Sequence, residues 1–290
     1  MAPDELFSLP FSTPALDRAG DRRKDAKWLA EAAADPSSLV LVLRDGATVP
    51  IQGGGLLWSP AGAVVDTSPQ DWIFLGIDDA GRALFASEGA PKESVTYATL
   101  RDLGPTLGLQ DADAAVEAVA LYTWHRRHHF CAMCGAPTAP AEGGHTRHCE
   151  SCGTDHFPRT DPAVIMLVSD GDRCVLGRRI GAPEGRWSTL AGFVEPGETP
   201  EGAVAREVHE EVGLDVVSVR YRGAQPWPFP SSLMLAYEAT AAHGPLVIND
   251  EHHEVRWFTR GELATGMADG SLTLPGPVSA GHALIRSWLA

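Results

Sequence analysis

The sequence lacks three features that would place it in other protein classes. It contains no run near eighteen apolar residues, so no segment is predicted to span a membrane, and it shows no signal peptide. Its five cysteines in 290 residues do not suit the disulfide framework of a small secreted protein. Lys and Arg number 23 against 38 Asp and Glu, and the net charge of −15 argues against broad electrostatic binding to nucleic acid. With 44% apolar residues the chain can form two domains with cores, and we expect it in the cytoplasm.

The most informative stretch is GFVEPGETPEGAVAREVHEEVGL, residues 192–214. Its glycines and Pro196 favour a loop, and the following residues favour a helix that begins near Pro200, with Thr199 or Glu198 at its N-terminus. Helical spacing places three carboxylates on one face, from Glu207, Glu210 and Glu211. Like charges so placed repel, so either solvent screens them, Arg206 pairs with one, or hard cations bind there.

An isolated acidic cluster of this kind is usually a solvated helix face, but here its context is specific. The spacing resembles the Nudix box at Gly192, Glu198, Arg206, Glu207, Glu210, Glu211 and Gly213. The resemblance implies an α/β/α sandwich that hydrolyses a nucleoside diphosphate linked to another group, with Mg²⁺ or Mn²⁺ bound by carboxylates. We assign Glu207 and Glu211 as principal metal ligands, Glu210 as a third ligand or a base, and Arg206 as a partner of Glu198 that orients the loop.

Four of the cysteines form two CxxC pairs that are separated by fourteen residues: Cys131, Cys134, Cys149 and Cys152. This spacing is typical of a zinc ribbon, in which four thiolates close a structural Zn²⁺ site. The alternatives are two disulfides or a redox CxxC motif. His145 and His148 could stand in as ligands, although the four-cysteine set is complete without them. Cys174, in an apolar run, is expected to be a buried small hydrophobe.

A third motif, AQPWPFPSS at residues 224–232, has three prolines and two aromatic residues in nine positions. It is either a stiff loop whose rings cover the core or a rigid wall on which a base or nicotinamide stacks. The order zinc ribbon, Nudix box and QPWPFPxS resembles the NADH pyrophosphatase family, over roughly residues 125–290. Members of that family split NAD(H) into NMN(H) and AMP and can remove NAD caps from RNA.

The resemblance also implies individual site residues. The family's metal ligands fall on Glu207, Glu211, the carbonyl of Ala191 and a distal glutamate, which we place at Glu251 rather than Glu254 because it keeps the spacing of six residues before Trp257. The substrate-binding positions fall on Phe157, which would stack on adenine, on Gly281, and on Gln225, Pro226, Trp227, Pro228, Phe229, Pro230, Ser231 and Ser232. Two of these positions depart from the family pattern, with Phe157 for tyrosine and Gly281 for alanine, and Ala224 replaces the serine that often opens the proline-rich motif. We expect altered affinity rather than lost chemistry.

The first 120 residues carry no such motif. Apolar and polar residues alternate between Gly, Asp and Pro turns, which predicts half-buried antiparallel strands. An amphipathic helix with Asp111 or Asp113 near its cap is predicted to lead into the ribbon. The predicted fold is therefore α+β, with a small α+β N-terminal domain (1–125), a zinc ribbon (126–160) and an α/β/α Nudix domain (161–290).

Together with the motifs, the family resemblance implies a homodimeric, metal-dependent NAD(H) diphosphatase whose substrate includes NAD(H) and, as an alternative physiological substrate, the 5′ end of NAD-capped RNA. A basic cluster at residues 125–129, with Arg147 and Arg159, could meet phosphates or form a solvated face. A rival hypothesis is a nucleotide-sensing regulator with a nucleic-acid-binding zinc ribbon and an inert Nudix fold. An inert fold would not need every carboxylate of the box, and none is missing.

Overall fold

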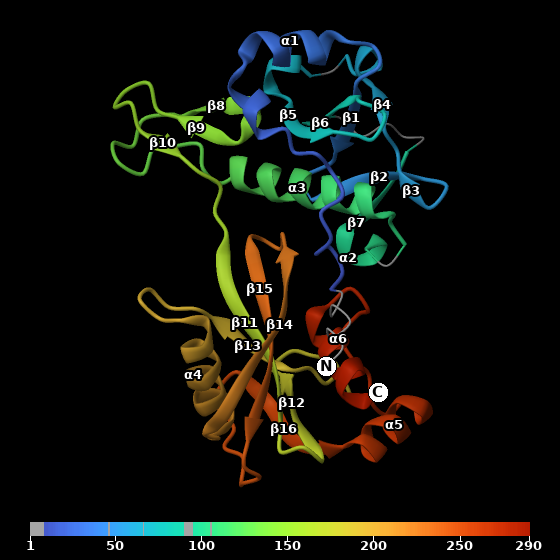
Figure 1. Cartoon of the computed structure of the whole chain (residues 1–290), viewed down its shortest axis with the longest axis vertical. Coiled ribbons are helices and arrows are strands. Elements are labelled where there is room, and N and C mark those ends of the chain that lie inside the picture. Colours follow the sequence, from blue (N-terminus) through green and yellow to red (C-terminus); the bar gives the residue numbers. More distant parts are fainter. Residues whose placement is uncertain (1–8, 46, 66, 90–94, 105) are drawn as a thin grey trace, which may run out of the picture. The chain divides into compact units, whose positions relative to one another are not determined.

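The chain divides into two compact units, each of which is described by itself (Figure 1). The computed structural model describes residues 9–290 except 46, 66, 90–94 and 105. Unit 1 comprises Met1–Ser12, Asp161–Pro226 and Ser232–Ala290, and unit 2 comprises Thr13–Thr160 and Trp227–Ser231.

Unit 1 is built on a six-stranded mixed sheet with the order β14-β15-β11-β12-β16, and β13 pairs with β11 beside this path. β11 runs parallel to β15 and antiparallel to β12 and β13. The elements are β11 (Asp161–Ser169), β12 (Arg173–Arg179), β13 (Leu190–Phe193), α4 (Pro200–Val212), β14 (Val216–Trp227), β15 (Ser232–Ala241), β16 (His252–Thr259), α5 (Arg260–Asp269) and α6 (Ala280–Leu289).

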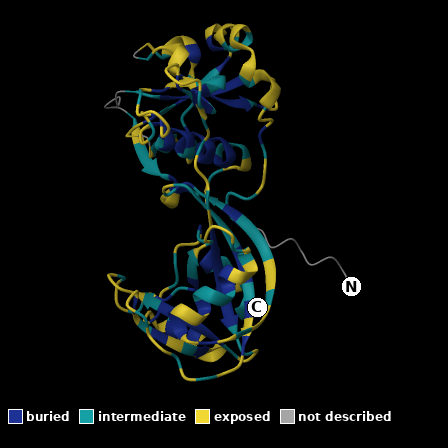
Figure 2. Cartoon of the chain, turned by 90° about the vertical axis from the view of Figure 1, so that its left-hand side faces the viewer, coloured by how far each residue is buried: buried dark blue, intermediate teal, exposed yellow. Residues whose placement is uncertain are grey.

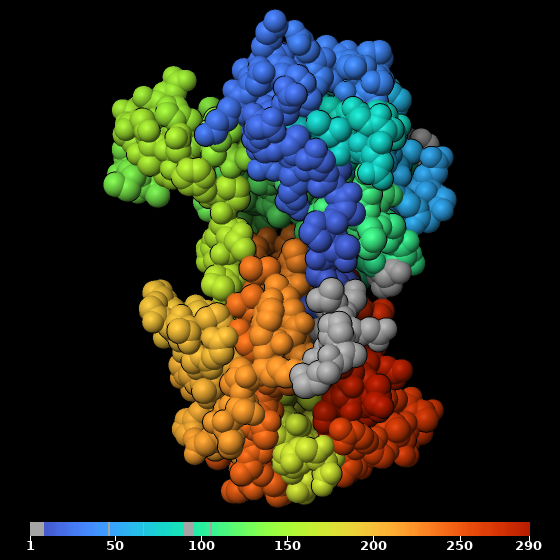
Figure 3. All heavy atoms as spheres, viewed as in Figure 1, coloured from blue at the N-terminus to red at the C-terminus, as the bar shows by residue number. Residues whose placement is uncertain are grey.

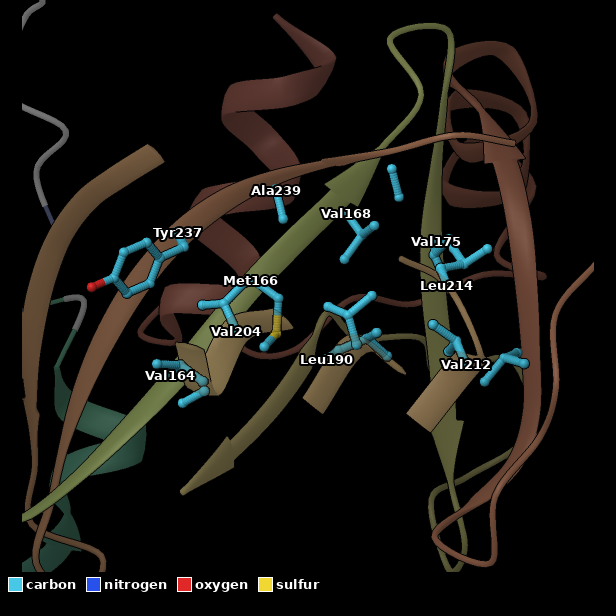
Figure 4. Close-up of a cluster of buried hydrophobic side chains, with 14 residues drawn as sticks. Val164, Met166, Val168, Val175, Leu190, Val204, Val212, Leu214, Tyr237 and Ala239 are labelled. Atoms are coloured by element: carbon cyan, nitrogen blue, oxygen red, sulfur yellow. The ribbon is translucent and has the colours of Figure 1, made fainter. Parts of the chain in front are cut away.

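Alternate residues of β11 supply the two cores of unit 1. Val164, Met166 and Val168 are fully buried and cluster with the valines of α4 on one face of the sheet (Figure 4). Ile165 and Leu167 point to the opposite face and cluster with residues of α6. Helices cover both faces of β11, which explains why its sequence is a continuous apolar run. The α/β/α sandwich predicted from the sequence is confirmed.

The ends of α4 follow from local chemistry. The hydroxyl of Thr199 accepts a hydrogen bond from the Gly202 N–H at 3.1 Å, and Pro200 occupies the first turn, where its missing N–H is not needed. Gly213 ends the helix with φ of 72°, a left-handed conformation that glycine adopts without strain. The helix start predicted near Pro200 is therefore confirmed.

Unit 2 contains a four-stranded sheet (β4-β1-β6-β5), a three-stranded sheet (β3-β2-β7) and the small sheet of the cysteine region (β10-β9-β8). Its elements are η1 (Gly20–Lys24), α1 (Ala26–Ala34), β1 (Leu39–Leu43), β2 (Thr48–Gln52), β3 (Gly55–Leu56), β4 (Ser59–Pro60), η2 (Ala61–Ala63), η3 (Pro69–Asp71), β5 (Ile73–Ile77), β6 (Ala83–Glu88), β7 (Thr96–Thr99), α2 (Leu100–Leu103), α3 (Leu109–His125), β8 (Ala139–Ala141), η4 (Glu142–Gly144), β9 (Thr146–His148) and β10 (Asp155–His156).

Two details of unit 2 differ from the sequence prediction. β1 pairs in parallel with β6, and β5 and β6 are almost entirely buried, so these strands are not simply half-buried and antiparallel. Helix α3 is buried on nearly all sides rather than amphipathic (Figure 2). Its N-cap is Gly108, and Asp111 lies in the first turn, near the cap as predicted. The side chains of both acids bind other segments: Asp111 accepts from Trp58 Nε1 at 2.9 Å, and Asp113 accepts from the Ala15 N–H at 2.9 Å. They hold remote segments of unit 2 against the helix.

None of the helices in the described ranges combines the length and the apolar character that crossing a bilayer requires.

Candidate active site and zinc centre

Arg206 organises the carboxylates of α4. Its Nε and Nη2 atoms donate to the two oxygens of Glu198, each at 2.9 Å, and its Nη1 atom donates to Glu207 at 2.9 Å and to Glu210 at 3.0 Å. Nη2 also donates to the Phe193 carbonyl at 2.9 Å. All five guanidinium donors are thus used. Hydrogen bonding to Arg206 lowers the pKa of Glu198, and the predicted pair between these residues is present.

Glu211 is the buried carboxylate of the set, with only 2% of the residue exposed. Burial raises its pKa to about 8, the negative charges of Glu207 and Glu251 act in the same direction, and Arg179 and the Ala191 N–H oppose the shift. Its Oε2 atom has no hydrogen-bond partner among the described residues. A buried carboxylate oxygen that lacks a protein donor is suited to a bound cation.

Glu207 lies directly over the backbone of β13. A Cβ atom added to Gly192 would overlap the Glu207 carboxylate, so only glycine permits this approach. Burial raises the pKa of Glu207, although Arg206 opposes the shift. The loop leading into α4 is exposed at residues 195–197, on the face shown in Figure 3. The Nudix box therefore brings together an exposed loop, a strand edge and the acidic face of α4.

The backbone of Ala191 faces the same carboxylates. Ala191 is paired in register with Ile165 of β11, and its N–H lowers the pKa of Glu211, so this N–H faces the Glu211 carboxylate. In an antiparallel pair the N–H and C=O of one residue point to the same side of the strand. The Ala191 carbonyl consequently faces the edge of β13 where Glu211 lies.

The two candidates for the distal glutamate have different surroundings. The negative charge of Glu251 raises the pKa of both Glu207 and Glu211, so its carboxylate lies within electrostatic reach of both. Both candidates pair with an arginine, Glu251 with Arg179 at 2.7 Å and Glu254 with Arg178 at 3.6 Å, but Glu254 is not among the charges that shift the pKa of Glu207 or Glu211. These contacts favour Glu251.

The oxygen donors of this set suit a hard divalent cation. Carboxylate and carbonyl oxygens are the ligands that Mg²⁺ and Mn²⁺ prefer. The Glu211 Oε2 atom, which accepts no hydrogen bond from a described residue, is suited to bind such a cation. The residues that would hold the cation are Ala191, Glu207, Glu211 and Glu251.

The four cysteines of the two CxxC pairs converge in unit 2, with all four sulfur atoms within 4.8 Å of one another. Cys131 lies 3.6 Å from Cys152, and Cys134 lies 3.6 Å from Cys149. Sulfur atoms bound at 2.3 Å to one tetrahedral zinc are about 3.8 Å apart, so the cluster fits a closed structural Zn²⁺ site. All five cysteines are free, which excludes the disulfide alternative in this structure.

The other cysteine and histidine candidates take structural roles. Cys174 is fully buried in the core, as predicted. His145 Nε2 donates to the Phe74 carbonyl at 2.7 Å, and His148 lies 2.6 Å from an Asp155 oxygen, so neither belongs to the cysteine cluster.

The predicted basic cluster does not form one surface. His125 and Arg147 are buried, and Arg147 Nη1 lies 2.8 Å from His125 Nδ1. Arg126 pairs with Glu88 at 2.9 Å. The cluster is therefore neither a single solvated face nor a single phosphate site.

The proline-rich motif is divided between the units. Gln225, Pro226 and Ser232 belong to unit 1, and residues 227–231 belong to unit 2. Within unit 2, Trp227 and Phe229 make an edge-to-face contact with centroids 5.0 Å apart. The Arg101 guanidinium lies 4.6 Å from the Phe229 ring. Arg101 was missed in the sequence because it stands outside any motif.

Gln225 is buried and fully engaged. Its amide nitrogen donates to the carbonyls of Pro10 and Val278, each at 2.8 Å, and its oxygen accepts from the Ala280 N–H at 3.0 Å. The side chain therefore positions the start of α6 rather than facing a ligand. Gly281 follows directly, and a Cβ there would lie 2.8 Å from Thr189 Oγ1, so glycine fits where the family pattern has alanine.

Phe157, the predicted stacking residue, belongs to unit 2 and is 70% exposed. Its ring is thus available to a ligand in that unit. The structure brings together Ala191, Arg206, Glu207, Glu210, Glu211 and Glu251 in one set, and Gln225 with Gly281 in another.

Comparison with known proteins agrees with this geometry. A family model described as NUDIX domain matches residues 159–274, and one described as NADH pyrophosphatase zinc ribbon domain matches residues 126–157. The fold and the site thus define a Nudix hydrolase that carries a zinc ribbon. The chain is 39% identical to the NAD-capped RNA hydrolase NudC of Mycobacterium bovis over 307 positions, which cover 99% of this chain and 96% of that protein. It belongs to the same family, the NADH pyrophosphatases and NAD-capped RNA hydrolases.

Two further proteins match a smaller part of the chain. The chain is 38% identical to the NAD-capped RNA hydrolase NUDT12 of Homo sapiens over 234 positions, which cover 75% of this chain and 50% of that protein. A crystal structure of a Nudix hydrolase from Nitrosomonas europaea is 26% identical, with a TM-score of 0.45, and covers 55% of this chain and 89% of its own.

Proposed function

We propose that this protein is a metal-dependent NAD(H) diphosphatase, which hydrolyses NADH or NAD⁺ to NMN(H) and AMP and also removes NAD caps from RNA. The observation that carries the proposal is the convergence of Glu207, Glu211 and Glu251, with one buried Glu211 oxygen that no described group satisfies. Family membership supports the substrate class, since the M. bovis and human relatives are NAD-capped RNA hydrolases.

In the proposed reaction, water attacks one phosphorus of the diphosphate, a new P–O bond forms and the bridging P–O bond breaks. Mg²⁺ or Mn²⁺, held by Ala191, Glu207, Glu211 and Glu251, would supply Lewis-acid stabilisation of the developing phosphate charge. Glu210 is 56% exposed, so it can accept the proton of the attacking water or act as a third ligand.

Other side chains would position this machinery. Arg206 fixes the loop through Glu198 and holds Glu207 in place, a task distinct from contact with substrate. Phe157 is the proposed stacking platform for a base, and the proline-rich motif the proposed wall for the remaining part of the dinucleotide.

The proposal includes three broader statements. Zn²⁺ at the four cysteines is structural because a tetrahedral four-thiolate site leaves no position for substrate. A cytoplasmic location is consistent with five cysteines that form no disulfide, a state that a reducing compartment preserves. The active protein is a homodimer, an expectation that follows from the family resemblance.

The rival hypothesis of an inert nucleotide sensor gains no support from the site. A sensor could lose individual carboxylates, yet every carboxylate of the box is present, and Arg206 holds three of them in place.

The test is incubation of purified protein with NADH and Mg²⁺ or Mn²⁺, with separation of products by chromatography. We expect NMNH and AMP, and a loss of kcat of roughly a hundredfold or more in the Glu211→Gln variant. Glu201→Gln is the matched control, because Glu201 is an exposed residue of the same helix. Comparison of kcat/KM for NADH and for NAD-capped RNA identifies the preferred substrate. An active Glu211→Gln variant would refute the ligand assignment, and intact NADH with the wild type would refute the substrate.

A further inference from the structure

Arg179 stands at the edge of the proposed metal site without a role in the Nudix box. It is the last residue of β12 and follows a register irregularity between Arg178 and Arg179. Its Nη2 atom donates to Glu251 Oε2 at 2.7 Å, and the adjacent backbone is held by an Ile180 N–H to Glu251 carbonyl bond at 2.9 Å. The backbone thus keeps the Arg179 side chain beside Glu251.

The positive charge of Arg179 also reaches a second member of the set. It lowers the pKa of Glu211, against the dominant effect of burial. Arg179 therefore stands near two of the carboxylates that would hold a divalent cation. A cation bound there would compete with the guanidinium for Glu251 and repel it.

The two arginines of the site differ in how firmly they are held. Arg206 uses all five donors, and its side chain is 24% exposed. In the described parts of the chain, Arg179 donates one side-chain hydrogen bond, to Glu251, and both side chains of this pair are more than half exposed, at 59% and 54%. An exposed pair of this kind is weak enough to exchange partners.

We propose that Arg179 is an exchangeable counter-ion of the site, which holds Glu251 until a divalent cation binds and then turns its guanidinium to the diphosphate of the substrate. Only the second part of this inference, in which the guanidinium binds the substrate diphosphate, rests on the proposed function. A guanidinium can bind two phosphate oxygens through parallel N–H donors, so the group that leaves Glu251 is chemically matched to the incoming ligand.

The first half is tested by titration of Mn²⁺ into protein without substrate, with free Mn²⁺ measured by electron paramagnetic resonance. Arg179→Gln removes the competing charge, so its Kd for Mn²⁺ should fall about two- to fivefold. Arg179→Lys keeps the charge and should resemble the wild type. Arg178→Gln is the matched control, because the neighbouring Arg178 lies against Glu254 instead, and it should also resemble the wild type. Unchanged or weaker Mn²⁺ binding by Arg179→Gln would overturn the counter-ion role.

The second half is tested by steady-state kinetics with NADH at saturating Mn²⁺. Loss of a charge-assisted hydrogen bond to phosphate should raise KM roughly 10- to 100-fold in Arg179→Gln, with a smaller change in kcat. Arg179→Lys should give an intermediate KM, since it retains the charge without the planar fork. An unchanged KM in Arg179→Gln would overturn the phosphate role. A wild type that leaves NADH intact would instead refute the proposed function, and the Mn²⁺ titration would still decide the counter-ion role.

Discussion

Replacement of Glu211 by glutamine should stabilise the protein in the absence of Mg²⁺ and Mn²⁺ while it removes activity. The reason is burial, which raises the pKa of Glu211 from 4.5 to about 8. The folded state therefore binds the proton more tightly than the unfolded state does, and stability is lost as the pH rises from about 4.5 to about 8. Glutamine is neutral at every pH in this range and avoids this loss.

The size of the effect follows from the shift. One pH unit corresponds to about 1.4 kcal/mol, so ionisation of Glu211 should reduce the free energy of unfolding by about 3 kcal/mol between pH 4.5 and pH 7. Glu211→Gln and the wild type should therefore have similar stability near pH 5. At pH 7 the variant should melt about 6–12 °C higher.

The assay is differential scanning calorimetry across pH 5–8, in buffer freed of Mg²⁺ and Mn²⁺ by a chelating resin, with the zinc content of each sample checked. Saturating Mg²⁺ should close the gap, since it binds the ionised carboxylate of the folded wild type. If the melting temperatures of the two proteins differed by the same amount at all pH values, the argument that Glu211 is a buried carboxylate with a raised pKa would be refuted.

Three further changes test other parts of the structure. Gly192→Ala should reduce kcat about a hundredfold with an unchanged circular dichroism spectrum, because the methyl group would displace the Glu207 carboxylate; near-normal turnover would contradict this. Cys149→Ser should lower bound zinc, measured by atomic absorption, from one per chain to a small fraction, and full zinc content would disprove the four-thiolate site. Gln225→Ala should lower the free energy of unfolding by about 3 kcal/mol in urea titrations, because the Ala280 N–H and two carbonyls lose their partner. A loss below about 1 kcal/mol would show that these hydrogen bonds contribute little to stability.

The sequence predicts the elements of unit 1 well because their signals are local. Thr199 and Pro200 mark the start of the box helix through capping and backbone preference, as predicted, and Gly213 ends it. The alternation of β11 between two helical layers is likewise encoded in one apolar run.

Unit 2 could not be predicted to the same depth because its organisation depends on distant partners. The carboxylate of Asp113 accepts hydrogen bonds from the N–H groups of Ala15 and Leu16, which precede it by 98 and 97 residues, and no local pattern indicates such contacts. The parallel pairing of β1 with β6 joins strands about 40 residues apart, and alternation of apolar residues does not reveal strand direction.

The candidate site divides in the same way. The box carboxylates follow from spacing on one helix, whereas Glu251 required the family pattern, and Arg179 was missed since its partner lies 72 residues away. Gln225 was assigned to substrate from its motif, but its three hydrogen bonds give its side chain a structural role.

The hydrogen bonds of the Gln225 side chain to Pro10, Val278 and Ala280 also constrain the order in which the chain can fold on the ribosome. Leu9 is buried in the core with Leu284 and Ile285 of α6, and the Pro10 carbonyl accepts a hydrogen bond from the Gln225 amide. These early residues emerge first, yet their partners are synthesised last. The continuous segment Thr13–Thr160 of unit 2 can collapse during translation, while unit 1 can close only after release of the C-terminus. A recombinant fragment that starts at residue 161 would lack this closing piece, so the full chain is the appropriate material for biochemistry.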